Sequence, residues 1–263
     1  MKIHEPGIIF GAVLIVLFIG GCSTTKSEYV KFSDKVFEQC VRDSLKIVDG
    51  RPVTHLEAES LKVLDCFYDL PLSLKDLQNF PNIQEMFIYG AEIDDLSPIH
   101  FLKNLKDLTF WEAGLSEISG LEKLVSLEVL GIAYSPIKDL EPIWNLKNLK
   151  SLTLIGTEVM DLAPISGLVN LQSLTIQLNN ITDISALARL QKLTVLGASS
   201  NRIESVSPLS NLKELEEVYL DGNRISDILP LISLKKLEKL HLRDNPIRDF
   251  SPLDRMECAE ILR

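Results

Sequence analysis

The sequence predicts an α/β solenoid with parallel strands on its concave face, 3₁₀ or short helical turns on its convex face, and a helical cap at its N-terminal end. Two observations predict this fold. The pattern Leu-x-x-Leu-x-Leu recurs at a constant spacing of 22 residues. Within each copy, apolar and polar residues alternate as in a half-buried strand. A unit of this length buries its apolar face only against neighbouring copies.

Nine copies of the repeat follow one another without an insertion. When the first residue of each copy is position 0, apolar residues recur at positions 3, 5, 10, 13, 16 and 19. Side chains at positions 3 and 5 of the strand point into the core of the solenoid, so those at positions 2, 4 and 6 point outward. The copies begin at Leu61, Ile83, Leu105, Leu127, Leu149, Leu171, Leu193, Leu215 and Leu237. We therefore assign residues 61–258 to nine repeats.

The second half of each repeat carries turn-forming residues. An aspartate and a proline recur there, as at Asp139 and Pro142. An aspartate side chain caps free backbone N–H groups, and proline suits the first turn of a helix. Because a full α-helix does not fit the length available, we expect 3₁₀ or single-turn segments opposite each strand.

Position 8 distinguishes the two halves of the array. Small residues occupy it in the earlier repeats, with Asp69 in the first, whereas asparagine occupies it in the last four: Asn179, Asn201, Asn223 and Asn245. A buried asparagine can hydrogen-bond the backbone of a turn and stack with its equivalents as a ladder. We expect the ladder in the C-terminal half and a less rigid N-terminal half.

These repeats resemble the 22-residue internalin type of bacterial leucine-rich repeat, from residue 61 to about residue 256. The resemblance implies a leucine-rich repeat solenoid with an N-terminal cap over residues 31–60. The helix within this cap is expected to end at Asp49 and Gly50. Residues 259–263 would form a short C-terminal cap containing Ile261 and Leu262. The cap residues expected to face the first coil are Phe32, Val36, Phe37, Cys40, Val41 and Leu45.

Two cysteines are placed to join the cap to the first repeat. Cys40 lies on the apolar side of the expected cap helix, and Cys66 replaces an inward apolar residue at position 5. A disulfide between them is one interpretation, since an exported protein permits oxidation; two buried free thiols are the other. We expect Cys258 to be exposed and free. The cysteines lack the paired spacing of a zinc site.

The N-terminus has the pattern of an export signal. Residues 8–19 form an apolar run of about 18 Å at helical rise, which is short of the roughly 30 Å of a bilayer core. Such a run is typical of a secretory signal. Gly20-Gly21-Cys22 resembles a bacterial lipobox, which implies a lipoprotein signal peptide over residues 1–21, acylation (palmitate) at Cys22 and a tether over residues 22–30. An uncleaved anchor helix is the alternative.

The lipobox resemblance also implies a location. A lipid-anchored protein of the bacterial cell envelope is expected, and Ser23 after the cysteine resembles an outer-membrane sorting signal of Gram-negative cells. The membrane is then one partner, reached through the N-terminal lipid.

Composition and motifs exclude other classes. The formal net charge of −10 argues against nucleic acid, because no stripe of lysine and arginine is present to neutralise phosphates. No phosphate loop, HExxH motif or nucleophile elbow occurs. His241 with Asp221 and Asp244 could make at most a weak metal site, and a solvated histidine is the preferred interpretation. We expect no enzyme activity, cofactor or metal.

Exposed aromatic residues mark the candidate binding surface. They gather at positions 4, 6 and 7 of the early repeats, whereas the later repeats carry polar or charged residues there. The candidate partner-binding residues are Phe67, Tyr68, Phe87, Tyr89, Trp111, Tyr134, Ile155 and Leu178. Three roles remain open: contact with a partner, packing under the cap or a loop, and pairs that only stabilise the sheet.

The sequence therefore predicts a membrane-anchored module that binds a protein through its concave face. The partner could be a host surface protein, a component of the same envelope, or a toxin that this protein neutralises as an immunity factor. The rival hypothesis is a structural spacer of the envelope without a specific binding site.

Overall fold

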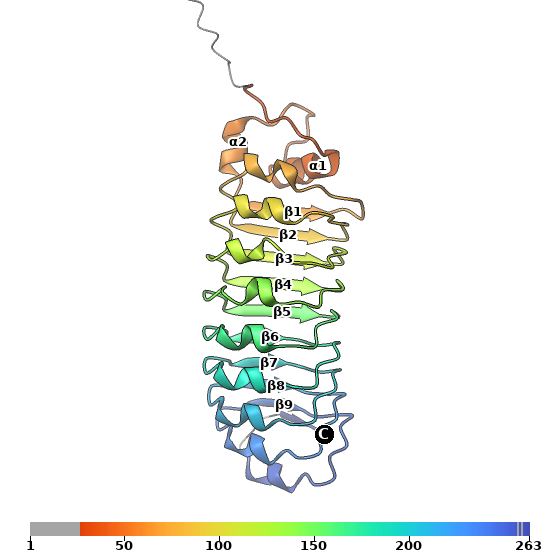
Figure 1. The fold of residues 1–263 in the computed structure, drawn as a ribbon, viewed down its shortest axis with the longest axis vertical. Coiled ribbons are helices and arrows are strands. Elements are labelled where there is room, and N and C mark those ends of the chain that lie inside the picture. The colour runs from red at the N-terminus through yellow and green to blue at the C-terminus, as the bar shows by residue number, and fades with distance from the viewer. Residues whose placement is uncertain (1–26, 257, 259) are drawn as a thin grey trace, which may run out of the picture.

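The computed structural model describes residues 27–256, 258 and 260–263, and shows a solenoid in which each repeat forms one coil (Figure 1). Ten parallel strands form one sheet in chain order. The strands are β1 Val63–Phe67, β2 Glu85–Tyr89, β3 Asp107–Trp111, β4 Val129–Ala133, β5 Ser151–Ile155, β6 Ser173–Thr175, β7 Val195–Gly197, β8 Glu217–Tyr219, β9 Lys239–His241 and β10 Glu260–Leu262. The predicted fold class is confirmed.

Strand register follows the repeat period. Leu108 on β3 lies opposite Leu130 on β4, which lies opposite Leu152 on β5. All three side chains are fully buried. A column of leucines one coil apart thus forms the core, because each coil covers the apolar side of its neighbour.

The convex side consists of 3₁₀ turns, as expected. They span η1 Lys75–Asn79, η2 Ser97–Phe101, η3 Leu121–Lys123, η4 Glu141–Ile143, η5 Ala163–Gly167, η6 Ser185–Arg189, η7 Ser207–Asn211, η8 Leu229–Ser233 and η9 Ser251–Arg255. The recurring aspartate begins most of them: Asp139 Oδ1 accepts a hydrogen bond from the backbone N–H of Glu141 at 2.8 Å. Each such carboxylate is therefore occupied in holding its own turn.

The asparagine ladder is present in the C-terminal half. The Asn201 amide donates to the carbonyl of Ile176 in the preceding coil at 2.7 Å and to that of Ala198 in its own coil at 3.2 Å. Its Oδ1 accepts from the N–H of Ile181 at 3.0 Å. Asn223 repeats the pattern one coil later. These side chains link successive coils through buried backbone groups that would otherwise lack partners.

The cap helix α1 (Lys35–Ser44) ends earlier than predicted. Asp34 caps it by accepting from the N–H of Phe37 at 2.7 Å. It ends because Lys46 adopts a left-handed φ of 58°, while the N–H of Ile47 bonds back to the carbonyl of Arg42 at 2.8 Å. This arrangement is a Schellman motif, which stops a helix without glycine. The expected end at residues 49–50 was wrong.

The cap packs on the first coil as predicted. Phe37, Cys40 and Val41 of α1 are fully buried, and Phe32, Val36 and Leu45 are partly buried against the same core. The Phe37 ring meets Phe80 of the first repeat edge-on, with centroids 5.7 Å apart. Buried Asp76 accepts from the N–H and hydroxyl of Ser33 at 2.7 and 3.0 Å. The cap thus supplies the neighbour that the first coil lacks.

A second helix in the cap, α2 (His55–Ser60), was not predicted. It begins with a capping box, in which the Thr54 hydroxyl and the Glu57 carboxylate each accept from the other's backbone N–H. Hydrogen bonds from Arg51 and then from Thr54 lower the pKa of Glu57 to about 2. The pattern Thr-x-x-Glu was visible in the sequence and could have identified this helix.

We expect the capping box to make stability depend on pH. The pKa of Glu57 is lower in the folded chain than the ordinary 4.5, so the stabilisation is present above pH 4.5 and disappears as pH falls towards about 2. Glu57→Gln should therefore lower the free energy of unfolding by about 1 kcal/mol at pH 7 and by less at pH 3. Urea denaturation at both values measures this. Glu59→Gln, on the same helix, is the control. Equal losses at both pH values would contradict the assignment.

The structure pairs Cys40 with Cys66 as a disulfide between α1 and β1, with their Cα atoms 4.9 Å apart. We predict that the exported protein contains this bond. For a separation of 26 residues, the chain-entropy model gives a stabilisation of about 3.5 kcal/mol. Cys40→Ser/Cys66→Ser should unfold at correspondingly lower urea, whereas Cys258→Ser should not. Without reductant, the unfolded wild-type protein should alkylate at Cys258 but not at Cys40 or Cys66. Alkylation of all three would exclude the bond.

The C-terminal cap adds a strand to the sheet. The N–H of Leu242 donates to the carbonyl of Leu262 at 2.8 Å, so β10 extends the ladder of β9. Ile261 packs against the core from this strand. Cys258 has a free thiol but is only half-exposed, and burial raises its pKa. The expectation of full exposure was wrong because β10 brings this segment back onto the last coil.

Among the residues that the structure describes, no helix has the length and apolarity needed to cross a membrane. The predicted signal peptide, and Cys22 as the lipidation site, lie outside the described residues.

Candidate functional site

The outward positions of the strands form columns across the concave face. Phe67 on β1 lies opposite Tyr89 on β2, which lies opposite Trp111 on β3. Adjacent strands are about 4.8 Å apart, so these side chains are nearest neighbours. The sequence prediction of which side chains face outward places all three correctly.

Five aromatic residues make up what we call the aromatic patch: Phe67, Phe87, Tyr89, Trp111 and Tyr134. The rings of Phe67 and Tyr89 are stacked, with centroids 4.5 Å apart and planes 7° apart. Trp111 meets Tyr134 edge-on at 5.1 Å. Phe67 is 64% exposed, Trp111 37% and Tyr134 43%. The pairs hold each other in place while leaving much of the ring surface open to a partner.

Tyr134 stands at a backbone position suited to glycine. It has φ 51°, and the same position holds Gly90, Gly156 and Gly222 in other repeats, all with positive φ. A side chain in this conformation costs about 1–2 kcal/mol. Leu178, with φ 57°, also stands at this position and is 49% exposed. Glu112, Ser200 and Asp244 also occupy this position with positive φ, but Tyr134 and Leu178 alone place large apolar surface there.

The remaining candidates differ in their surroundings. Phe87 and Ile155 are half-buried, and Leu178 lies at the rim of the coil that follows that of Ile155. The Tyr68 hydroxyl donates to Asp43 of α1, and its ring packs against the core. Tyr68 therefore joins the cap to the first coil instead of lying free in the patch. That contact depends on tertiary structure and was not readable from the repeat pattern.

Several outward positions are buried: Gly131, Ala133 and Gly197. Ala133 on β4 is only 1% exposed, although its place in the strand points outward. Tyr134 follows it at the rim, and its ring lies against Gly156: a Cβ at Gly156 would meet that ring at 2.8 Å. The small residues at 133 and 156 thus make room for the Tyr134 ring beside Trp111.

Three carboxylates border the aromatic patch and were not singled out in the sequence. Asp65, Glu85 and Asp107 occupy outward positions of β1, β2 and β3, and Glu85 lies opposite Asp107. Asp107 Oδ1 is buried and has no hydrogen-bond partner among the described residues. Burial raises the pKa of Asp107, and the charge of Glu85 raises it further. These carboxylates stand at positions 2 and 4 of the first three repeats, so the sequence could have identified them as outward-facing neighbours.

Several charged residues at the far end of the concave face are paired, whereas Arg243 forms no ion pair among the described residues. Glu217 accepts from Lys239 at 2.8 Å, and this hydrogen bond lowers the pKa of Glu217. His241 lies 3.6 Å from Asp221 and 3.2 Å from Glu260. The histidine therefore interacts with a carboxylate of β10 that the sequence analysis did not name, whereas Asp244 takes no part in these pairs. In the described part of the chain, no group of histidine, cysteine and carboxylate side chains is arranged to hold a metal ion.

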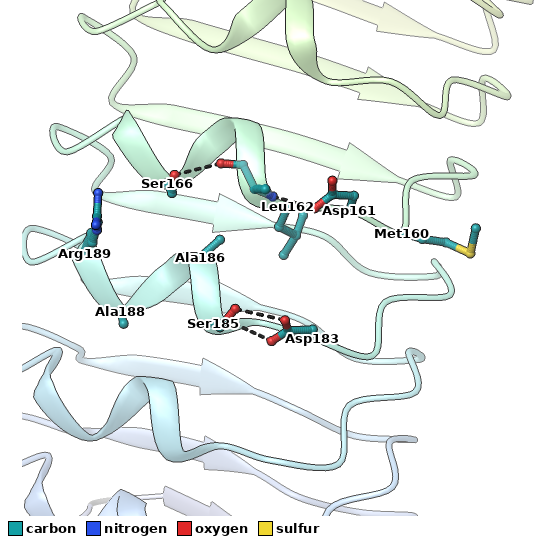
Figure 2. Close-up of a pocket in the computed structure, with 10 residues that line it drawn as sticks. Met160, Asp161, Leu162, Ser166, Asp183, Ser185, Ala186, Ala188 and Arg189 are labelled. Atoms are coloured by element: carbon teal, nitrogen blue, oxygen red, sulfur yellow. Dashed lines mark hydrogen bonds between the residues drawn. The ribbon is translucent and has the colours of Figure 1, made fainter.

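A shallow depression of about 400 Å³ lies on the convex side between η5 and η6 (Figure 2). Its polar groups are occupied by the turns: Asp161 accepts from the N–H of Ala163, and Asp183 accepts from the N–H and hydroxyl of Ser185. A similar depression, also lined by an aspartate and the following turn, lies between η2 and η3. The depression between η5 and η6 therefore results from the stacking of turns, and its aspartates are not free to act on a ligand.

Comparison with known protein families supports the repeat assignment. The family described as Leucine Rich repeats (2 copies) matches residues 191–233 and 213–255. A search of curated protein sequences found no significant match.

Solved structures match most of the chain. Internalin C2 of Listeria monocytogenes is 30% identical, with a TM-score of 0.66, and the match covers 88% of this chain and 93% of that one. Internalin F of Listeria monocytogenes is 22% identical, with a TM-score of 0.58 over 88% of this chain and 95% of that one. A leucine-rich repeat protein of Leptospira interrogans is 24% identical, with a TM-score of 0.71 over 77% and 55%. The last two matches show the fold alone.

Proposed function

Because the chain belongs to the leucine-rich repeat proteins and is structurally similar to the Listeria internalins, we propose that it binds another protein through the aromatic patch. A solenoid of this kind is typically a binding module without catalysis. Its concave sheet offers an extended surface on rigid strands, and protein partners are the class of ligand that such surfaces usually serve.

The observation that carries the proposal is the arrangement of rings at the N-terminal half of the concave face. Tryptophan and tyrosine dominate binding energy at interfaces. Here the strands hold Phe67, Tyr89 and Trp111 in register, so little side-chain freedom is lost on contact. Tyr134 adds an exposed ring at the rim, in a backbone conformation that is costly for a side chain. Ile155 and Leu178 extend the apolar surface towards the middle of the array.

The experiment is a cross-linking pulldown from cells of the source organism, with wild-type protein beside Trp111→Ala. The chain offers a matched control: Trp144, on the convex side after η4, is 53% exposed. We expect one partner to be recovered by wild type and by Trp144→Ala but lost with Trp111→Ala. Recovery that is the same with all three proteins would exclude the patch.

A structural envelope spacer is the rival function. It would need no specific patch, so removal of the aromatic rings would leave its role unchanged. The exposed rings of the aromatic patch favour the binding module. Within that class, the partner remains a host surface protein, an envelope component or a toxin.

We also propose that Cys22 carries a lipid anchor that places the repeats at the bacterial envelope, at the outer membrane in a Gram-negative cell. The support is the short apolar run that ends in Gly20-Gly21-Cys22. Two acyl chains suffice for stable attachment where one does not.

The anchor predicts a partitioning difference. Wild-type protein expressed in a bacterium should enter the detergent phase of a cloud-point separation, and Cys22→Ala should lose acylation and enter the aqueous phase. Cys258→Ala is the cysteine control and should behave as wild type. If both cysteine variants enter the detergent phase with an intact N-terminus, an uncleaved helix is the anchor instead.

A further inference from the structure

The two halves of the concave face differ in how their charges are satisfied. At the far end, Glu217 is paired with Lys239, and His241 lies between two carboxylates. In β1–β3, the outward positions hold one carboxylate each, and no outward position of β1–β5 holds lysine, arginine or histidine. Asp65, Glu85 and Asp107 form no ion pair with any residue that the structure describes. The negative charge beside the aromatic patch is thus uncompensated.

Lysines near these strands do not provide the missing charge. The carbonyl of Lys62 accepts from the N–H of Glu85 at 3.1 Å, but its side chain forms no ion pair among the described residues. Lys150 pairs with Glu128 at 2.5 Å, and Lys106 also acts on Glu128, whose pKa both lower. The charge that acts on Asp107 is that of Glu85, a like charge. Two carboxylates on adjacent strands, one with a buried and unpartnered oxygen, are unfavourable for the free protein.

Phe87 lies among these carboxylates. On β2 it is two residues after Glu85 and two before Tyr89, and across the sheet it is opposite Asp65. Asp107 is diagonal to it on β3. One cationic side chain reaching Phe87 would therefore meet an aromatic face and carboxylates at once.

From this juxtaposition, and resting on the proposed function, we infer that the aromatic patch receives an arginine-bearing segment of the partner protein. A guanidinium group stacks on an aromatic ring through its face and donates to carboxylates through its edge. Lysine offers a point charge without the planar fork, so it satisfies only part of this site. The partner's cation would offset the negative charge that Asp65, Glu85 and Asp107 place beside Phe87.

The test uses two fluorescein-labelled peptides, hexa-arginine and hexalysine, titrated against the full chain by fluorescence anisotropy. Wild type should bind hexa-arginine more tightly than hexalysine. Glu85→Gln/Asp107→Asn should weaken hexa-arginine binding about tenfold or more. The control is Glu117→Gln/Glu158→Gln, which removes two exposed carboxylates outside the strands and changes the net charge equally; it should stay within about twofold. Thermal unfolding of Glu85→Gln/Asp107→Asn should be unchanged or shifted upward, since like charges are removed.

Equal weakening by the two double variants would overturn the inference, because attraction would then follow net charge. Absence of hexa-arginine binding to wild type, or a preference for hexalysine, would overturn it too. The proposed function is judged separately. If the cross-linked partner is lost with Trp111→Ala but retained in full by Glu85→Gln/Asp107→Asn, the patch binds a protein whose contact is not cationic. If the partner is retained by Trp111→Ala, the proposed function itself fails.

Discussion

Leu130→Asp is expected to abolish cooperative folding of the repeat array. Leu130 is fully buried on β4 between Leu108 and Leu152 of the adjacent coils. Truncating a buried leucine costs about 2–5 kcal/mol, and an unpaired carboxylate in its place adds several more. The sum is comparable to the whole stability of a typical domain, about 5–15 kcal/mol. Because each coil is covered only by its neighbours, the loss also separates the two halves of the array.

Urea denaturation followed by circular dichroism measures this effect. Ser151→Asp is the control, since Ser151 is at an outward position of β5 and half-buried. It should keep a cooperative transition near that of wild type. A Leu130→Asp protein that unfolds at the wild-type urea concentration would show that the leucine column does not hold the coils together.

Trp111→Ala is expected to weaken partner binding about thirtyfold, which corresponds to roughly 2 kcal/mol. Trp111 is central in the patch: it follows Tyr89 in register and contacts Tyr134 edge-on. Removing its ring takes away both its own contact area and the support for Tyr134. The inward neighbours Leu108 and Phe110 remain buried, so the fold should persist.

The measurement is a titration of the partner recovered by cross-linking, with circular dichroism as the folding control. Trp144→Ala should bind as wild type does. Arg243→Ala, at the exposed far end of the concave face, should alter the salt dependence of binding more than its affinity. Undiminished binding by a folded Trp111→Ala protein would move the site away from the aromatic patch.

The repeated part of the fold could be predicted because it is specified many times over. Positions such as Leu108, Leu130 and Leu152 carry the same information in successive copies, so a local ambiguity in one copy is resolved by the next. The cap occurs once. The left-handed turn that ends α1 is at Lys46 and not at a glycine, so the sequence does not mark it. Helix α2 is six residues long, which is too short to show a periodic pattern.

The candidate site was predictable as far as strand alternation reaches. Alternation identified the outward rings, but not that Tyr68 bonds to the cap or that Ala133 is covered, since both depend on side chains from other elements. The unpaired state of Asp107 likewise required knowledge of its neighbours. The pairing of His241 with Glu260 could not be predicted, because Glu260 lies on β10, a strand outside the repeat pattern.

We expect the partner to contact the N-terminal half of the concave face. Tryptophan occurs only at 111 and 144, so protein labelled with 5-fluorotryptophan gives two ¹⁹F resonances, which Trp111→Phe and Trp144→Phe assign. The unlabelled partner is then added to the full chain. We predict that the Trp111 resonance shifts or broadens, while the Trp144 resonance broadens only because the complex is larger. A shifted Trp144 resonance with an unchanged Trp111 resonance would contradict it.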